Sequence, residues 1–468
     1  MHKMMNDPLF QKLKISLNKV QNDRSSHFFG WRLSVSECRS RQSLLVGDDE
    51  LGFESYQDRD VKDLSYHVEV FTRHGSPEVM GNSVSSIDPL VSLDGQITKI
   101  LENALLVGNK VWDLARPADN DGYEAFSVNT SDQQISDDIS GAHEGLLGIV
   151  SETAKANNGV KINSGELFTN LERKYFETSS GLAGGKEKTD IYFEMALEKL
   201  PLPNTQEVLK YKKAISLEEA DLASFMYEVI DETLSIQETE MPATQNDAAI
   251  LVDGDTASDF FHELVGFLSA GREYNKQPFM DRGAAVYKGE KHPSSDKLQL
   301  TLDPTLPVMA QSSPYTSEGL IASKAKVIED DVVQSQIVHH KMGQYLNKAV
   351  NNIDGNMVVE LGGLSKADLL SSVAECIEIL SFSSLLINSN TLTWSSEIKL
   401  GKLYRQGECV AMIKGGVVSG DLRENLCDFS FGNEEVKLNS IGSVFDPTKG
   451  YIGPNAMLIR AGVKIAGE

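Results

Sequence analysis

One stretch decides how the C-terminal half of the chain folds: Ala248-Ala-Ile-Leu-Val252, Asp253-Gly-Asp-Thr256 and Ala257-Ser-Asp-Phe-Phe-His-Glu-Leu-Val-Gly-Phe-Leu-Ser-Ala-Gly271. The first part is a compact apolar run and predicts a buried strand. The second part combines a turn with acidic residues that favour a helix start. The third part has apolar residues at helical spacing and predicts a helix. The sequence therefore predicts a strand, a turn and an amphipathic helix in succession.

The predicted helix carries one pair of residues with chemical potential, His262 and Glu263. Zinc peptidases place ligands beside a general base with a helix that bears His-Glu and a second histidine downstream. Here the positions four and five residues after His262 are Gly266 and Phe267, and neither side chain binds a metal. A second His-Glu pair, at 143–144, falls in a helix that we expect to face solvent. The dipeptide alone is therefore a weak indication of a metal site.

The N-terminal half predicts a mixture of helices and strands. A helix is expected near 7–20, and strands are expected at 28–35, 64–72 and 190–197. Helices are also expected over 97–112, with one buried stripe through Trp112, and over 146–156. Ser216-Leu-Glu-Glu219 has the form of a capping box before another helix. We expect core faces in two of these helices, at Ile97, Leu101, Leu105 and at Phe225, Val229, Ile230.

A polar break at 238–247, which contains Pro242, predicts the main domain boundary. We therefore expect an N-terminal α+β domain over 1–240 and a C-terminal domain over 241–468.

Composition narrows the class of protein further. The chain has 468 residues, enough for two or three domains, and 44 Lys plus Arg against 68 Asp plus Glu give a net charge of −24. A field of that sign repels phosphate backbones, so we expect no direct nucleic-acid binding. No apolar run approaches the roughly 20 residues that span a bilayer, and no signal peptide is evident. We expect a cytoplasmic protein without membrane contact.

The four cysteines, Cys38, Cys376, Cys409 and Cys427, are far apart and form no C-x-x-C pair. This spacing argues against a disulfide framework and against a zinc site made of cysteine alone.

Several blocks, in this order, resemble the TldD/PmbA family, long labelled modulators of DNA gyrase. Phe261-His-Glu-Leu-Val-Gly266 looks like the family's helix, whose peptidase branch reads H-E-x-x-x-H. Similar matches follow at Ser317-Glu-Gly319 with the strand-turn-strand 327–334, at the hairpin 406–420, and at the closing strand 458–467. The resemblance implies an α+β architecture in two parts, whose C-terminal domain has a curved, largely antiparallel sheet. It also implies dimers, in which a zinc-bearing TldD-type subunit can pair with a metal-free PmbA-type (TldE) subunit to cleave unfolded or modified peptides.

Departures from the family pattern indicate the branch. The peptidase branch holds zinc with two helix histidines and a cysteine near its C-terminus. Here Phe267 replaces the second histidine, and no cysteine follows Cys427. A catalytic zinc needs three protein ligands, and His262 alone would hold it weakly. The chain thus resembles the metal-free PmbA type, with no cofactor expected and the partner either a TldD-like subunit or a second copy.

An altered metal site is the alternative. His339 and His340 follow the predicted strand 332–338, and one of them could join His262 and an acid, Glu263 or Glu318. Ordinary surface or packing roles for both histidines are favoured. Likewise, Asp330 and Asp331 indicate a turn more than a calcium site.

Two classes of function stay open at this point. The chain is either a non-catalytic subunit or scaffold that holds an extended peptide at a sheet edge, or an active metallopeptidase with non-standard zinc ligands. In the second class Glu263 would act as general base, because a metal would polarise the carbonyl beside it.

Overall fold

The computed structural model describes residues 2–23, 27–48, 52–157, 159–200, 207–236, 238–440 and 449–467. The chain divides into two compact units. Unit 1 comprises Met1–Ile230, Ser313–Ala322 and His339–Asn352, and unit 2 comprises Asp231–Ser312, Ser323–Val338 and Ile353–Glu468. Two short segments of the C-terminal half thus belong to unit 1. Compactness does not test independent folding, so the domains 1–240 and 241–468 stay a prediction.

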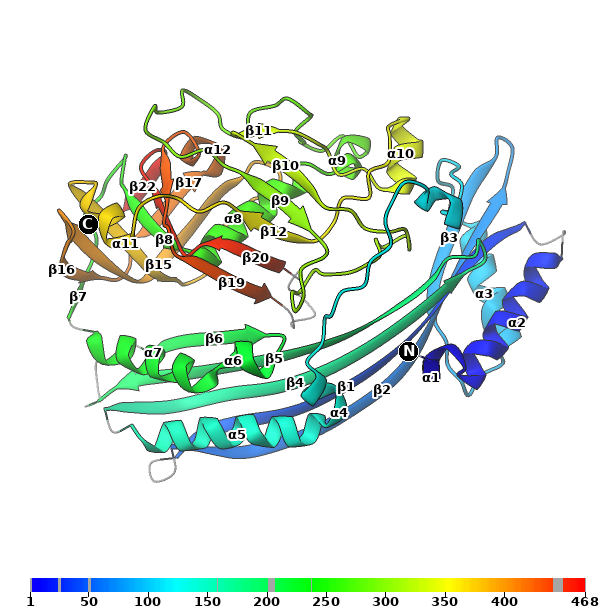
Figure 1. Cartoon of the computed structure of the whole chain (residues 1–468), viewed down its shortest axis with the longest axis horizontal. Helices are drawn as coiled ribbons and strands as arrows, with labels where there is room; N and C mark the ends of the chain where they lie inside the picture. Colours follow the sequence, from blue (N-terminus) through cyan, green and yellow to red (C-terminus); the bar gives the residue numbers. More distant parts are fainter. Residues whose placement is uncertain are drawn as a thin grey trace. The chain divides into compact units, whose positions relative to one another are not determined.

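Unit 1 is built on a six-stranded antiparallel sheet in the order β3-β2-β1-β4-β5-β6. Figure 1 shows that its central strands are long and curved. The strands are β1 (Phe28–Asp48), β2 (Gly52–His74), β3 (Val79–Ser86), β4 (Val160–Thr178), β5 (Ala183–Lys199) and β6 (Val208–Ala214). The predicted strands at 28–35, 64–72 and 190–197 lie within β1, β2 and β5.

Side chains alternate across this sheet, because successive residues of a strand point to opposite faces. In β1, Trp31, Leu33 and Val35 are buried in a core with α2 (Pro8–Asn22) and α3 (Leu93–Leu105). Arg32, which lies between them in the sequence, therefore points to the opposite face. That face carries the pocket described below.

The helix expected over 97–112 ends earlier, at Leu105, so the prediction of one helical stripe through Trp112 was wrong. The chain leaves the helix because Asn109 pairs with Met80 of β3 through two backbone hydrogen bonds of 2.8 and 2.9 Å. Trp112 is nevertheless buried, packed edge-on against Phe71 and Tyr345. Of the expected core residues, Ile97 is fully buried and Leu101 and Leu105 are half-buried.

The expectation that His143 faces solvent was also wrong. His143 lies on α5 (Ile139–Lys155) and is 2% exposed. Its Nε2 lies 2.9 Å from the Ser43 hydroxyl and its Nδ1 lies 3.0 Å from the Thr169 hydroxyl. Polar partners on β1 and β4 thus allow this ring to be buried.

The remaining elements of unit 1 are short, apart from α7. The helix cap expected at Ser216 is confirmed, since its hydroxyl accepts the backbone N–H of Glu219 at 3.2 Å. The return bond differs from the expected capping box, because the Glu219 carboxylate accepts the N–H of Ile215, one residue before the cap. The elements are α1 (His2–Met5), η1 (Pro117–Asn120), α4 (Gln133–Asp137), α6 (Leu217–Ala220), α7 (Leu222–Ser235, which runs on into unit 2) and α10 (His340–Leu346).

Unit 2 contains two sheets and a shared apolar core. One sheet has the order β11-β10-β9-β12-β20-β19, and the main path of the other is β18-β21-β8-β13-β15-β16-β7. Most pairs are antiparallel, as predicted; β12 with β20, β8 with β13, and β7 with β16 are parallel. The α+β class is confirmed.

The elements of unit 2 have the following bounds. The strands are β7 (Thr239–Glu240), β8 (Ile250–Asp253), β9 (Leu300–Asp303), β10 (Ala325–Glu329), β11 (Val332–Val333), β12 (Asn356–Val359), β13 (Glu375–Phe382), β14 (Leu386–Ile387), β15 (Thr393–Arg405), β16 (Glu408–Ile413), β17 (Val417–Asp421), β18 (Phe429–Phe431), β19 (Glu435–Ser440), β20 (Lys449–Pro454), β21 (Ala456–Ile459) and β22 (Val463–Ala466). The helices are α8 (Gly254–Gly266), α9 (Ala270–Tyr274), α11 (Lys366–Ser371) and α12 (Leu422–Asn425).

Two predictions in unit 2 need correction. The single helix expected over 257–271 is split into α8 and α9, because the backbone at Leu268 and Ala270 pairs with Ile337. The single closing strand at 458–467 consists of the end of β21 and β22, separated by Gly462 at φ +69°. The strand-turn-strand at 327–334 is confirmed, with Asp330 and Asp331 in left-handed turn conformations.

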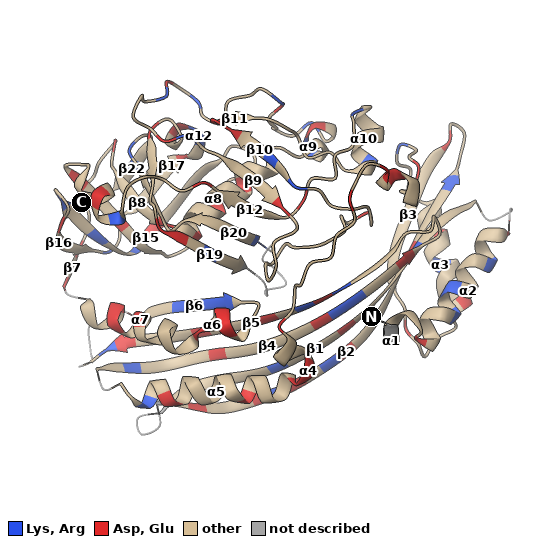
Figure 2. Ribbon diagram, in the orientation of Figure 1, with Lys and Arg blue, Asp and Glu red and all other residues tan. Residues whose placement is uncertain are grey.

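Charges of both signs are interspersed along the strands of unit 1 (Figure 2). Arg173 of β4 illustrates the pairing, with Glu187 of β5 at 2.5 Å and Glu37 of β1 at 3.5 Å. Among the described residues, no helix is both long and apolar enough to cross a membrane.

Candidate functional site

Helix α8 presents two contrasting faces, as its helical period dictates. Phe260 and Phe261 are fully buried and pack against Trp394 and Phe431, with ring centroids 5.3 and 5.9 Å apart. The opposite face carries Asp259, His262, Glu263 and Gly266, at spacings of three and four residues. The Asp253 carboxylate caps the helix by accepting the N–H of Thr256 at 2.9 Å. The His-Glu pair therefore sits on the partly exposed face of a firmly anchored helix.

A lysine sets the electrostatics of this face. Lys449 of β20 forms an ion pair with Asp259. Burial lowers the pKa of His262, and the Lys449 charge lowers it further while Asp259 opposes. Burial raises the pKa of Glu263, against the attraction of Lys449 and Arg272. The imidazole is therefore neutral at neutral pH, and the carboxylate is a stronger base than an exposed one.

The helix does not provide the ligands that a zinc ion needs. Gly266, one turn after His262, has no side chain, and space for one is open there. Phe267 is 5% exposed and packs in the core, with the Arg272 guanidinium 4.5 Å from its ring centroid. The Lys449 ammonium already neutralises Asp259, so this face offers a cation little attraction.

Cys427 does not complete a site either. Its thiol is buried and donates toward the carbonyl oxygens of Lys288 at 3.2 Å and Arg423 at 3.7 Å. Burial raises the pKa of this thiol. Zinc binds the thiolate, so a protonated cysteine held by backbone carbonyls does not fit the role.

His339 and His340 lie in unit 1, at the start of α10, whereas His262 and Glu263 lie in unit 2. His340 Nε2 is 3.0 Å from the Asp113 carbonyl, and Glu318 accepts the His340 N–H at 2.7 Å. Across the part of the chain that the structure describes, no three His, Cys, Asp or Glu side chains are grouped so that they could hold a metal ion. The role assigned to Glu263 stays a prediction.

Sequence reasoning missed two residues of the α8 face. Asp259 lies three residues before His262, so helical spacing alone could have placed it there. Lys449 is 190 residues from Asp259 in the sequence, and no local pattern indicates that they meet.

Fold and site together define a class: a two-unit α+β protein whose helix α8 carries a His-Glu pair like that of zinc peptidases, with no grouped metal ligands in the part of the chain that the structure describes. Residues 245–465 match the family model described as the PmbA/TldA metallopeptidase C-terminal domain. Residues 245–465 therefore form a domain of the TldD/PmbA family. No curated protein matches it in sequence.

Solved structures match nearly the whole chain. A Bacteroides thetaiotaomicron protein that carries the name modulator of DNA gyrase is 14% identical, with a TM-score of 0.79, and the match covers 99% of this chain and 100% of that one. TldE of Thermococcus kodakarensis is 13% identical, with a TM-score of 0.76 and coverage of 97% and 100%. A Thermotoga maritima protein also named for modulation of DNA gyrase is 15% identical, with a TM-score of 0.75 and coverage of 97% and 99%. At such identities these likenesses show the fold.

Proposed function

We propose that this chain is a metal-free, TldE-like subunit that holds unfolded or modified peptides in the cytoplasm for cleavage by a zinc-bearing, TldD-type partner. The observation that carries the proposal is the α8 face, where His262 has no second metal ligand among the described residues and Lys449 supplies the positive charge. The fold shared with TldE of T. kodakarensis supports the subtype.

The chain offers sheet edges on which an extended peptide can form backbone hydrogen bonds. Among the described strands, β19 is the outer strand of its sheet and pairs with β20, which begins at Lys449. Helix α8 packs against β20. An edge strand near this face is thus a suitable place to hold a peptide beside the partner's zinc. The alternative, an active metallopeptidase with non-standard ligands, agrees with the raised pKa of Glu263 but lacks, among the described residues, a group of side chains that could hold its metal.

The proposal is tested with denatured casein as an unfolded substrate. The purified chain alone is expected to bind casein without cleaving it. Adding the TldD-type protein of the same organism is expected to produce a complex and cleavage faster than that protein achieves alone. Cleavage by the chain alone that a chelator stops would overturn the proposal and support the alternative.

A single variant checks whether Glu263 takes part in catalysis. Glu263→Gln is expected to leave the accelerated cleavage within about twofold, because the partner's zinc site supplies the general base. The same substitution would abolish cleavage if this chain were the catalyst.

A further inference from the structure

Unit 1 contains a pocket that lies apart from α8 in the chain and that no part of the proposed function uses. Its volume is about 190 Å³, and all its lining residues belong to unit 1. Clefts for drug-sized ligands measure about 300–1,000 Å³. This pocket therefore accommodates a single end group or side chain.

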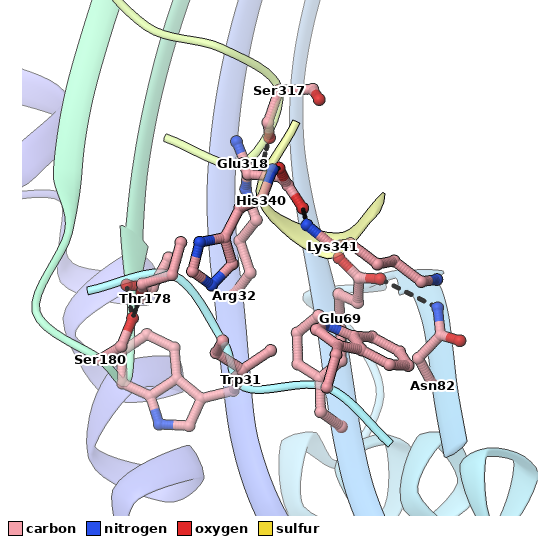
Figure 3. Close-up of a pocket in the computed structure, with 14 residues that line it drawn as sticks. Trp31, Arg32, Glu69, Asn82, Thr178, Ser180, Ser317, Glu318, His340 and Lys341 are labelled. Atoms are coloured by element: carbon pink, nitrogen blue, oxygen red, sulfur yellow. Dashed lines mark hydrogen bonds between the residues drawn. The ribbon is translucent and has the colours of Figure 1, made fainter. Parts of the chain in front are cut away.

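Strand register brings the polar residues of the pocket together. Arg32 of β1 is paired with Glu69 of β2 on one side and with Thr178 of β4 on the other. Directly paired residues point to the same face of a sheet, so the three side chains form a row. Figure 3 shows Arg32 between Thr178 and Glu69, beneath Ser317.

Arg32 has hydrogen-bonding capacity to spare. Its Nη1 donates to the Ser317 carbonyl, and the guanidinium lies 4.6 Å from the Phe176 ring centroid. A guanidinium has five N–H donors, and no carboxylate within the described ranges is close enough to form an ion pair with this one. Burial lowers the pKa of Arg32, although Glu69 and Glu318 act to raise it. An anionic group would compensate this half-buried charge.

The nearby carboxylates already have other partners. Glu318 accepts the backbone N–H groups of His340 at 2.7 Å and Lys341 at 3.0 Å. Glu69 accepts the Asn82 amide at 3.1 Å. The negative charges of Glu318 and Glu69 reduce the positive potential in the pocket, so a singly charged carboxylate fits better than a phosphate dianion.

Lys341 and an aromatic wall complete the pocket. The Lys341 ammonium lies 4.1 Å from the Trp112 ring centroid and 5.5 Å from that of Tyr345, and it forms no carboxylate ion pair in the described part of the chain. Trp112 packs edge-on against Phe71, with ring centroids 6.1 Å apart. The pocket thus joins two cations to a flat apolar surface.

We propose that this pocket binds the C-terminal carboxylate of a peptide, with the last side chain packed on Trp112 and Phe71. Arg32 binds the carboxylate through the N–H groups that it does not donate to Ser317, and the positive charge of Lys341 attracts the same carboxylate. Asn82 and Glu69 lie where they can hydrogen-bond the peptide's last amide. This inference rests on the proposed peptide-holding function, and it assigns the recognition of the peptide's C-terminus to unit 1.

The test uses two versions of one unstructured peptide that ends in phenylalanine, a free acid and a C-terminal amide, with N-acetyl-phenylalanine as a minimal probe. Binding is measured by calorimetry. The free acid is expected to bind about tenfold or more tightly than the amide, because only the acid offers a charge-assisted pair to Arg32. Arg32→Gln should remove this difference, and Lys341→Gln should reduce it several-fold. Arg39→Gln, which removes the same charge from β1 outside the pocket, should preserve it.

The outcomes separate this inference from the proposed function. Equal binding of acid and amide would overturn the pocket's role while peptide holding stands. Binding of N-acetyl-phenylalanine that depends on Arg32, without binding of either peptide, would support the pocket and overturn peptide holding. Tighter binding of inorganic phosphate than of N-acetyl-phenylalanine would also overturn the inference. Lys341→Gln keeps the test decisive if Arg32→Gln fails to fold.

Discussion

The buried His143 makes the stability of unit 1 depend on pH in a way that can be calculated. Burial lowers the pKa of this ring from 6.5 to about 4, with Arg41 acting in the same direction and Asp58 opposing. Its two nitrogens are occupied by the hydroxyls of Ser43 and Thr169. The folded protein therefore holds the ring neutral where an exposed histidine would be charged.

The sign of the effect follows from proton binding. Above pH 6.5 the ring is neutral in both the folded and the unfolded chain, so His143 contributes no pH dependence. As pH falls from 6.5 toward 4, the unfolded chain takes up a proton that the folded chain refuses, and stability is lost. Each pKa unit corresponds to about 1.4 kcal/mol, so the full loss is about 3 kcal/mol, of which about 2 kcal/mol falls between about pH 7.5 and pH 5.

Urea unfolding of the wild type, His143→Leu and Val150→Ala at these two pH values measures the effect, with tryptophan fluorescence and circular dichroism as probes. His143→Leu should be less stable near pH 7.5, because Thr169 loses its side-chain partner, but should lose about 2 kcal/mol less than wild type on acidification. Val150→Ala, a buried change on the same helix, should keep the wild-type pH dependence. Equal pH dependence in His143→Leu and wild type would refute the reasoning.

Three further predictions concern α8, the core and a helix cap. Gly266→His should place a second imidazole in open space one turn after His262, so zinc should raise the melting temperature of this variant. Zinc should not raise the melting temperature of Gly266→Ala or of the double variant Gly266→His with His262→Ala. A Gly266→His variant whose melting temperature zinc does not change would contradict this geometry. Phe261→Ala should cost about 3–5 kcal/mol in urea unfolding, because Phe261 is fully buried against Phe431, whereas Leu386→Ala, at an exposed side chain, should cost under about 0.5 kcal/mol. Ser216→Ala should cost about 1 kcal/mol by the same assay through loss of the cap of α6, and an unchanged midpoint would show that the cap is not needed.

Local sequence patterns predicted the elements that depend on contacts between residues close together in the sequence. The cap at Ser216 and the turn at Asp330 and Asp331 depend on near neighbours, and both formed as expected. The apolar run before Asp253 became strand β8, and the helix after it became α8. Family resemblance added the order of the elements along the whole chain.

Long-range pairing explains what the sequence could not predict. The helix expected over 97–112 ends at Leu105, because Asn109 pairs with Met80 of β3. His143 is buried because Ser43 and Thr169, on two distant strands, offer it hydroxyls. These partners are specified by strand register, which no local period reveals.

The candidate sites likewise combine features that the local sequence predicts with features that depend on long-range pairing. The absence of a second histidine after His262 was readable from the sequence, whereas the Lys449 charge beside it was not. The pocket around Arg32 joins residues of β1, β2 and β4 to Glu318 and Lys341, which lie in the C-terminal half of the sequence. Glu318 and Lys341 reach the pocket because residues 313–322 and 339–352 fold as part of unit 1.

The zinc content of the purified chain tests the central claim most directly. Elemental analysis should find far less than one zinc per chain in the wild type, with no significant change in His262→Ala or in His339→Ala combined with His340→Ala. Near-stoichiometric zinc that is lost in these variants would contradict the account and identify the chain as a metallopeptidase with its own site.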